Sequence, residues 1–465
     1  MDDPRTLFDR AARVAADHRS VVADGLVPAT VTAAGLRGTV DAHLRDRPTP
    51  ADEVLEELVT SFTPGVVATA GPRFFGFVIG GALPAASAAD LVAVGWDQCA
   101  FNATLSPAAA VAEDLAGGWL KEVLGLPAGA TVGFVTGAQG ANTVSLATAR
   151  HHVLANVGWD VERDGLLGAP RVRVVASVER HATIDRALRL IGFGTAVVEE
   201  VASDANGAID VADLEAVLAG GAPGPTIVCL QSGNVNTGAC DDLRAACAVA
   251  RRHGAWVHVD GAFGLWAGAS PTRAHLVDGV ELADSWSCDG HKWLNVPYDC
   301  GFAICAHGQV HAGSLSYTAA YLTGQGGATP ALGDLVPESS RRARGFAVWA
   351  AFRELGRDGL ADLVERGCTL AQRFADGLEA GGAEVVNDVV LNQVLVGFGS
   401  DERTDRVVEA VQQDGTCWLG ATSWHGRRLM RVSVSNWSTT EQDVDRSVAA
   451  ILEVAAQVAA PVTPG

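Results

Sequence analysis

Lysine is almost absent from this chain of 465 residues. Of its 34 basic residues only Lys121 and Lys292 are lysines, and 54 acidic residues bring the formal net charge to −20. Nucleic acids and anionic membranes require clustered positive charge, so this balance excludes both as partners. Arginine binds anions but cannot form a Schiff base, so the two lysines are the first candidates for covalent chemistry.

Long apolar runs, a leader segment and paired cysteines are also missing. The longest uncharged stretch near the start, Phe74 to Ala89, is interrupted by glycine and proline and is too short for a membrane span. The first residues lack the basic-then-apolar order of a signal peptide. Nine cysteines without a C-x-x-C pair indicate free thiols in a reducing compartment. We therefore expect a soluble cytoplasmic protein.

Several common site motifs do not occur. No histidine is followed by glutamate, neither lysine lies in a P-loop, and the G-x-S-x-G and G-x-G-x-x-G patterns are missing. Cys288 and His291 have a loosely metal-like spacing. Without paired cysteine halves, core packing is the better interpretation, and we expect no metal.

The order of elements predicts an α/β fold. The first ~65 residues have a helical pattern. From about residue 130 to 306, short β-branched runs alternate with helical segments, which predicts a mostly parallel sheet covered by helices. The expected strands are Thr131–Thr136, Arg171–Val178, Thr195–Val201, Thr226–Gln231, Trp256–Asp260 and Gly301–Cys305. A helix at Gly345–Leu355 then leads to a smaller α+β part, with strands Val389–Phe398 and Leu429–Ser435 and a helix Thr439–Val458.

Four features follow expected strands, where open α/β sheets bind ligands. The glycine-rich turn 137–142 opens a helix and offers backbone N–H groups to an anion, although it could be only a tight turn. Asp260 ends a strand and precedes small residues that admit a flat ligand; the alternative is an ordinary turn. His181 follows another strand, a place where a histidine is often structural.

Lys292 is the fourth feature. It lies beside His291 in an apolar context, where desolvation lowers the pKa of an amine and frees it to attack a carbonyl. Lys121, in contrast, lies on what the pattern indicates is an exposed helix face. Together these four features describe a site for pyridoxal phosphate: a cradle for an anion, a carboxylate, small residues that admit a flat ring, and a lysine. The ring of this cofactor accepts electrons when its nitrogen is kept protonated.

With these residues the chain resembles the group II pyridoxal-phosphate decarboxylases, relatives of aromatic amino-acid, glutamate and histidine decarboxylases. The similarity runs from about Pro72 to Asn436, and its most specific pieces are 258–262 and 283–293. It implies the aspartate-aminotransferase fold (fold type I) with a seven-stranded, mostly parallel sheet. It also implies a helical segment at 1–65 that forms a homodimer, a large cofactor domain at 66–345 and a small domain at 346–465.

The resemblance also implies roles for individual residues. Lys292 would form the Schiff base, Asp260 would contact the ring nitrogen, and His181 and Ala262 would cover the two ring faces. The phosphate would be held around Ala138, Gln139 and Gly140, together with His291. Arg431 would anchor the substrate carboxylate, unless it forms only a surface salt bridge. Phe75, Phe77 and Asn102 fall in the region that lines the substrate pocket, although the phenylalanines could equally be core residues.

The chain departs from the family where the reaction outcome is decided. Family members usually carry a loop tyrosine that supports protonation of the substrate carbon, and Leu332 stands near that place. The only tyrosines are Tyr298, Tyr317 and Tyr321. Ala138 and Gly140 stand where serines are frequent, and Gly71 stands where many members have histidine.

We expect decarboxylation of an L-amino acid to an amine and carbon dioxide. The alternatives are decarboxylation coupled to oxidation, which gives an aldehyde, and aldol-type cleavage of a carbon–carbon bond. A non-catalytic regulator that binds the same cofactor would normally carry a basic DNA-binding module, and this acidic chain shows none.

Overall fold

A computed structural model describes residues 3–317 and 331–458 of the chain. The chain divides into two compact units. Unit 1 comprises Met1–Gly81, Arg373–Val386 and Leu395–Gly465, and unit 2 comprises Ala82–Gln372 and Asn387–Val394. The expected division into 1–65, 66–345 and 346–465 follows the family and stays a prediction.

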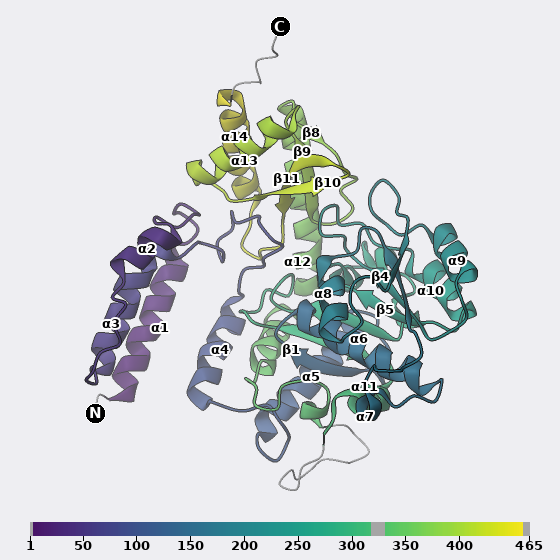
Figure 1. Cartoon of the computed structure of the whole chain (residues 1–465). Coiled ribbons are helices and arrows are strands. Elements are labelled where there is room, and N and C mark those ends of the chain that lie inside the picture. Colours follow the sequence, from purple (N-terminus) through teal and green to yellow (C-terminus); the bar gives the residue numbers. More distant parts are fainter. Residues whose placement is uncertain (1–2, 318–330, 459–465) are drawn as a thin grey trace. The chain divides into compact units, whose positions relative to one another are not determined.

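Unit 2 is built on a seven-stranded sheet in the order β1-β7-β6-β5-β4-β2-β3. Figure 1 labels β1, β4 and β5 of this sheet. The strands are β1 Thr131–Val135, β2 Arg173–Ser177, β3 Val198–Val201, β4 Thr226–Gln231, β5 Trp256–Asp260, β6 Ser285–Asp289 and β7 Gly301–Cys305. Only β7 runs antiparallel to its neighbours, β1 and β6. The other six strands therefore end at the same edge of the sheet, and the expected mostly parallel fold is confirmed.

The sequence found six of these strands and missed β6. Strands β4, β5 and β7 have the expected bounds. In β6, Ser285, Ser287 and Asp289 alternate with Trp286 and Cys288, which is typical of a strand with one face in water. All five residues are buried nonetheless, because the sheet is covered on both faces.

The helices of unit 2 are α4 Pro84–Trp96, α5 Pro107–Val123, α6 Ala138–Ala155, α7 Val161–Asp164, α8 Ala182–Leu190, α9 Val211–Gly220, α10 Leu243–Arg252, α11 Gly308–Leu315 and the first part of α12 Gly345–Ala380. Of these, α5, α6, α9 and α10 pack directly on strands of the sheet. Leu146 of α6 and Leu188 of α8 pack with Val174, Ile227 and Trp256 in one apolar core. This packing holds the start of α6 close to the strand ends, because α6 contacts β1, β4, β5, β6 and β7.

Unit 1 combines the N-terminal helices with a small four-stranded sheet. Its helices are α1 Pro4–Val21, α2 Ala33–Thr39, α3 Ala51–Phe62, α13 Asp401–Asp414, α14 Glu441–Gln457 and the end of α12. The sheet order is β10-β11-β9-β8, with β8 Glu384–Val385, β9 Gln393–Gly397, β10 Gly420–Trp424 and β11 Arg427–Ser433. The strand expected at Val389–Phe398 begins later, at Gln393, and the sequence missed β8 and β10.

Two further expectations can be compared with the structure. The helix expected to end at Leu355 does so, because Gly356 has φ of 61° and interrupts α12 there. All nine cysteines lie among the described residues and are free thiols. Over residues 3–317 and 331–458, no helix combines the length and apolar character needed to cross a bilayer.

Candidate active site

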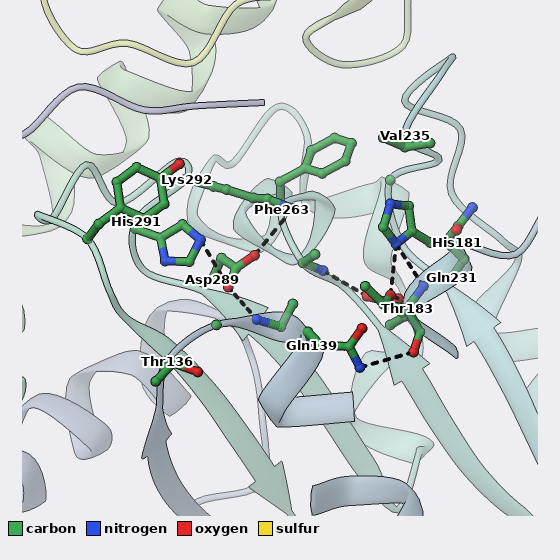
Figure 2. A pocket seen from close by; sticks show the side chains of 16 residues that line it. Thr136, Gln139, His181, Thr183, Gln231, Val235, Phe263, Asp289, His291 and Lys292 are labelled. Atoms are coloured by element: carbon green, nitrogen blue, oxygen red, sulfur yellow. Dashed lines mark hydrogen bonds and ion pairs between the residues drawn. The ribbon is translucent and has the colours of Figure 1, made fainter. Parts of the chain in front are cut away.

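A cavity of about 380 Å³ lies in unit 2 at the strand ends and the start of α6 (Figure 2). Its lining includes His181, Asp260, Ala262 and Lys292, which come from three separate stretches of sequence. Parallel strands deliver such residues to one edge of the sheet, as the sequence predicted. The cavity therefore joins the proposed lysine, carboxylate and histidine in one place.

Asp260 ends β5 and is only 5% exposed, with four neutral hydrogen-bond donors around its carboxylate. Its Oδ2 accepts from Asn142 Nδ2 at 3.0 Å and from Thr183 Oγ1 at 3.3 Å. Its Oδ1 accepts from Ser287 Oγ at 3.2 Å and from the Ala262 N–H at 3.3 Å. No cation is among these partners, so the carboxylate is free to pair with a cationic ring nitrogen.

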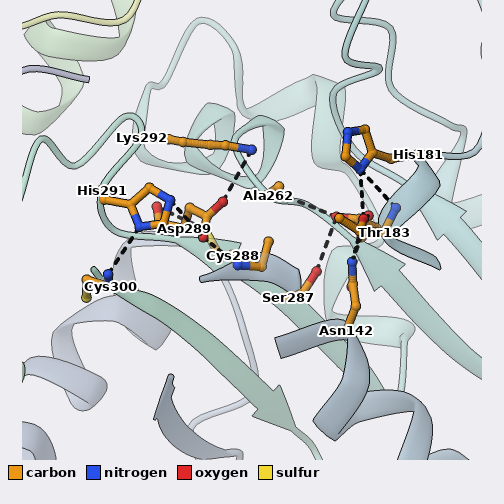
Figure 3. Close-up of polar contacts among 12 residues, drawn as sticks. Asn142, His181, Thr183, Ala262, Ser287, Cys288, Asp289, His291, Lys292 and Cys300 are labelled. Atoms are coloured by element: carbon orange, nitrogen blue, oxygen red, sulfur yellow. Dashed lines mark hydrogen bonds and ion pairs between the residues drawn. The ribbon is translucent and has the colours of Figure 1, made fainter. Parts of the chain in front are cut away.

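His181 is the residue that caps the N-terminus of α8, and its ring is held by Thr183. The Thr183 backbone N–H donates to His181 Nδ1 at 3.3 Å, and the Thr183 hydroxyl lies 2.8 Å from the same nitrogen. Figure 3 shows His181, Thr183 and Asn142 together on one side of the site. The strand-end histidine is thus structural and lines the cavity at the same time.

Lys292 faces a second buried carboxylate. Its Nζ lies 3.2 Å from Asp289 Oδ2 and 5.8 Å from the centre of the Phe263 ring, and the lysine side chain is 18% exposed. Figure 3 shows Lys292 extending over Asp289. The apolar context expected from the sequence is therefore incomplete, because a buried acid compensates the ammonium charge.

The anion cradle is formed by the start of α6 and by His291. The Cys300 N–H donates to His291 Nδ1 at 3.1 Å, and burial lowers the pKa of His291. The ring is therefore neutral and carries its proton on Nε2, which lies 3.5 Å from Asp289 Oδ1. The Ala138 N–H donates to the same Asp289 oxygen at 2.5 Å. Two donors thus converge on Asp289 Oδ1, beside the turn proposed to hold the phosphate.

These residues fit pyridoxal phosphate. An amine, a buried carboxylate and a cradle of donors lie around one cavity, as the aldehyde, ring nitrogen and phosphate of that cofactor require. A Cβ on Gly137 would lie 2.9 Å from His291 Cε1, so only glycine leaves the cradle open.

Not every expected site residue lies in the cavity. Gly140 is in the first turn of α6 but does not line it. Asn102 caps a turn, because its Oδ1 accepts from the Leu105 N–H at 2.8 Å. Phe75 is 1% exposed and packs edge-on against Phe374 in unit 1, so it is a core residue, the alternative that the sequence left open.

Arg431 and Phe77 also belong to unit 1, whereas the cavity belongs to unit 2. Arg431 lies on β11 opposite Gly420, and burial lowers the pKa of its guanidinium. Phe77 is 64% exposed and stacks on Trp418, with ring centres 5.3 Å apart. Their proposed contact with the substrate stays a prediction.

Three residues that hold Asp260 and Lys292 in place were not identified from the sequence. Asn142 and Thr183 hold Asp260, and Asp289 holds Lys292. The signal for Asp289 was its place three residues before the lysine, at the end of an unrecognised strand. Nothing in the sequence pairs Asn142 with Asp260, because 118 residues separate them.

A fold of this type with a lysine, a buried carboxylate and an anion cradle defines a pyridoxal-phosphate enzyme. The family model described as "Pyridoxal-dependent decarboxylase conserved domain" matches residues 34–398. The chain belongs to this family; its cofactor is pyridoxal phosphate, and it is an amino acid decarboxylase.

Individual relatives agree with this assignment. Tryptophan decarboxylase 1 of Oryza sativa subsp. japonica is 30% identical over 95% of this chain and 92% of its own. The crystal structure of Oryza sativa TDC with PLP and tryptamine has a TM-score of 0.90 and 28% identity, and covers 98% of both chains. The 4-hydroxyphenylacetaldehyde synthase of Rhodiola rosea is 27% identical over 87% of this chain and 85% of its own.

Proposed function

We propose that this enzyme decarboxylates an L-amino acid to an amine, with Lys292, Asp260 and His181 as its catalytic residues. The observation that supports this most is the shared cavity, which is lined both by one of the chain's two lysines, Lys292, and by Asp260, a buried carboxylate whose hydrogen-bond donors are neutral. The family's chemistry supports the reaction class, and the contacts support the role that we propose for each residue.

When bound, the cofactor supplies an electron sink for the negative charge that develops as the carboxylate leaves. Lys292 would hold the cofactor covalently. Asp260 would pair with the ring nitrogen and stabilise the developing charge electrostatically. His181 and Ala262 would contact the ring, while Ala138, Gln139 and the His291 Nε2–H would bind the phosphate.

Substrate orientation is proposed to depend on Arg431. A buried guanidinium can bind a carboxylate with two parallel hydrogen bonds, and this contact would orient the substrate carboxylate for the cleavage that the cofactor would promote. Gly140 would help to bind the cofactor phosphate, and Asn102 and Phe77 would contact the substrate. Arg431→Lys should raise the KM and lower kcat together, because the bidentate geometry is lost.

The amine product depends on a proton source near the reacting carbon. Tyr298 lines the cavity, and its ring centre lies 4.4 Å from that of His291, with the two rings tilted by 31°. Burial raises the pKa of the Tyr298 hydroxyl to about 12, which keeps it protonated. We therefore propose that Tyr298 and Lys292 protonate the carbon in place of the missing loop tyrosine. Leu332 begins a short 3-10 turn, Leu332–Asp334, and Tyr321 lies outside the described residues.

An aldehyde product is the second candidate. It is favoured by the leucine at position 332 and by relatives that are named aldehyde synthases, from Rhodiola rosea and from a Rosa hybrid cultivar. Oxygen uptake matched to turnover would indicate this outcome. Aldol-type cleavage would release no carbon dioxide.

A product screen tests the proposal. Purified enzyme with pyridoxal phosphate meets a pool of amino acids in air, and mass spectrometry follows amines, aldehydes and carbon dioxide. We expect an amine from the wild type, none from Lys292→Ala, and unchanged product from Lys121→Ala. Lys121 is a matched control in the same unit, where its Nζ only bonds the Ala128 and Ala130 carbonyls at 2.8 Å. Full turnover by Lys292→Ala would refute the scheme.

We also propose a homodimer. Trp96 and Val111 are 57% and 58% exposed, and with Val92, Leu115 and Trp349 they line an apolar groove of about 530 Å³ on α4, α5 and α12. Exposed apolar patches of this kind mark interaction surfaces. In addition, helices α1, α2 and α3 bury no residue within this chain. Sedimentation should give a dimer for the wild type and a monomer for Val111→Glu.

A cytoplasmic location is proposed on the basis of the thiols. All nine cysteines are free, and a reducing compartment preserves them in that state.

A further inference from the structure

His258 is a fully buried histidine that the proposed reaction does not use. It lies on β5, two residues before Asp260, with no exposed surface. Its Nδ1 lies 3.0 Å from Ser285 Oγ and its Nε2 lies 2.9 Å from Asn142 Oδ1. Burial lowers the pKa of His258 to about 4, so its ring is neutral at neutral pH.

The contacts of Asn142 determine which ring nitrogen carries the proton. An ionised carboxylate only accepts hydrogen bonds, so Asn142 must present its Nδ2 to Asp260 Oδ2, at 3.0 Å. The second Nδ2 hydrogen is donated to Thr183 Oγ1 at 3.1 Å. Asn142 Oδ1 is then left facing His258, and it is satisfied only if His258 Nε2 donates.

The far side of the ring agrees with this assignment. With the proton on Nε2, His258 Nδ1 must accept, and the Ser285 hydroxyl is its donor. Ser285 Oγ in turn accepts from the Trp256 indole Nε1–H at 3.0 Å. With the His258 proton on Nε2, every hydrogen-bonding group in the series Trp256, Ser285, His258, Asn142 and Asp260 therefore has a partner of the right kind.

We propose that His258 and Asn142 are positioning residues that hold the Asp260 carboxylate correctly oriented toward the cofactor ring nitrogen. The proposal rests on the role given to Asp260 above. Each donated hydrogen bond stabilises the charged form of a carboxylate. Without the His258 donor, the Asn142 amide is free to turn and present its oxygen to Asp260, and the proton on the ring nitrogen would be shared more with the carboxylate.

Two substitutions at one position separate this role from packing. In His258→Gln the side-chain amide can still donate to Asn142 Oδ1, whereas in His258→Leu it cannot. We expect kcat to fall about tenfold in His258→Leu with KM unchanged, and to stay within about threefold of wild type in His258→Gln, since one lost hydrogen bond is worth about one decade. With ¹⁵N-labelled cofactor, the ring-nitrogen resonance should move toward the neutral position only in His258→Leu.

His311→Leu is the matched control. His311 of α11 is also buried, with 1% exposure, and burial lowers its pKa to about 4. It bonds Thr131 on β1 instead, at 2.9 Å. Loss of this histidine should lower the stability of the protein, but it should change neither the ¹⁵N resonance of the cofactor ring nitrogen nor kcat. Equal behaviour of His258→Leu, His258→Gln and His311→Leu would overturn the proposal.

A measurement without cofactor keeps the inference separate from the proposed function. ¹⁵N-histidine spectra of the cofactor-free protein should show His258 neutral with its proton on Nε2 at pH 7. A proton on Nδ1, or a charged ring, would overturn the proposed His258 relay, that is, the hydrogen bonds that run from His258 through Asn142 to Asp260. This holds even if the enzyme is a fully active decarboxylase. If the enzyme instead shows no decarboxylation while this tautomer is found, the proposed function fails and the relay assignment stands.

Discussion

Asp260 and Asp289 end neighbouring strands, line the same cavity and are both almost fully buried, yet their partners differ in kind. Asp260 is surrounded by neutral donors from Asn142, Thr183, Ser287 and Ala262. Asp289 lies against the Lys292 ammonium and the start of α6. One carboxylate thus keeps its charge available for a ligand, while the chain itself neutralises the other.

The difference shows how a strand end acquires its role. A buried carboxylate is costly unless it is paired or hydrogen-bonded. Hydrogen bonds from neutral groups satisfy Asp260 but leave it negative, as an electrostatic partner of a cationic ring must be. The same residue type at Asp289 serves to hold Lys292 and to cap a helix. Each of the following substitutions is chosen to break or sharpen this contrast.

The largest expected effect comes from removing the charge of Asp260. Asp260→Asn keeps the size of the side chain but leaves the ring nitrogen without its ionic partner. We expect kcat to fall by about 10³-fold, or roughly 4 kcal/mol, as for other lost electrostatic contacts to developing charge. Steady-state kinetics at saturating cofactor measures this.

Asp289→Asn is the comparison variant for that experiment, since it removes one charge from the same cavity. Its kcat should fall by less than about tenfold, because Asp289 contacts the lysine and not the ring. Equal losses in the two variants would show that the contrast between the carboxylates has no catalytic meaning.

For the affinity for pyridoxal phosphate, in contrast to kcat, Asp289 should be the more influential of the two carboxylates. Asp289 Oδ1 accepts from the Ala138 N–H, which is one of the donors proposed for the phosphate. Removing its negative charge should tighten binding of pyridoxal phosphate by about tenfold, since like charges a few ångströms apart repel at partly buried sites. Fluorescence titration of the cofactor-free protein measures the Kd.

Pyridoxal, which lacks the phosphate, is the control for this prediction. Its Kd should be the same for Asp289→Asn and wild type. If Asp289→Asn tightens both ligands equally, the effect is on the lysine and the cradle assignment is wrong.

The sheet was predictable because strand signals are local. An apolar β-branched run such as Thr226–Gln231 can be recognised as a strand from its own six residues. Lys292 and Asp260 were found for a similar reason: a rare residue and a strand-end acid are visible in short windows. β6 was hidden because buried polar residues, satisfied by partners from elsewhere in the chain, imitate an exposed strand.

The hydrogen-bond partners were not predictable. Asn142 meets Asp260 and His258 across 118 and 116 residues, and only the packing of α6 on the sheet brings them together. Similarly, Lys121 was expected on an exposed helix face, but its ammonium bonds two loop carbonyls. Such contacts depend on the three-dimensional path of the chain and leave no periodic trace in the sequence.

The smallest expected effect is on acid stability, to which the buried rings of His258 and His311 should contribute equally. Burial lowers the pKa of both His258 and His311 to about 4, below the value of about 6.5 in an unfolded chain. Their contribution to stability is complete above pH 6.5 and is lost as the pH falls toward 4, because the unfolded chain binds the protons first. Each histidine adds a slope of at most about 1.4 kcal/mol per pH unit.

Urea unfolding of apo-protein between pH 7 and pH 5 checks this expectation. Burial raises the pKa of Asp241 to about 7, which gives a slope of opposite sign, so each variant is compared with wild type and not with zero. His258→Leu and His311→Leu should each flatten the acid slope by the same amount. Only His258→Leu should also alter turnover, since only that ring connects to Asp260 through Asn142. A slope that neither variant changes would mean that the carboxylates, and not the buried histidines, govern acid unfolding.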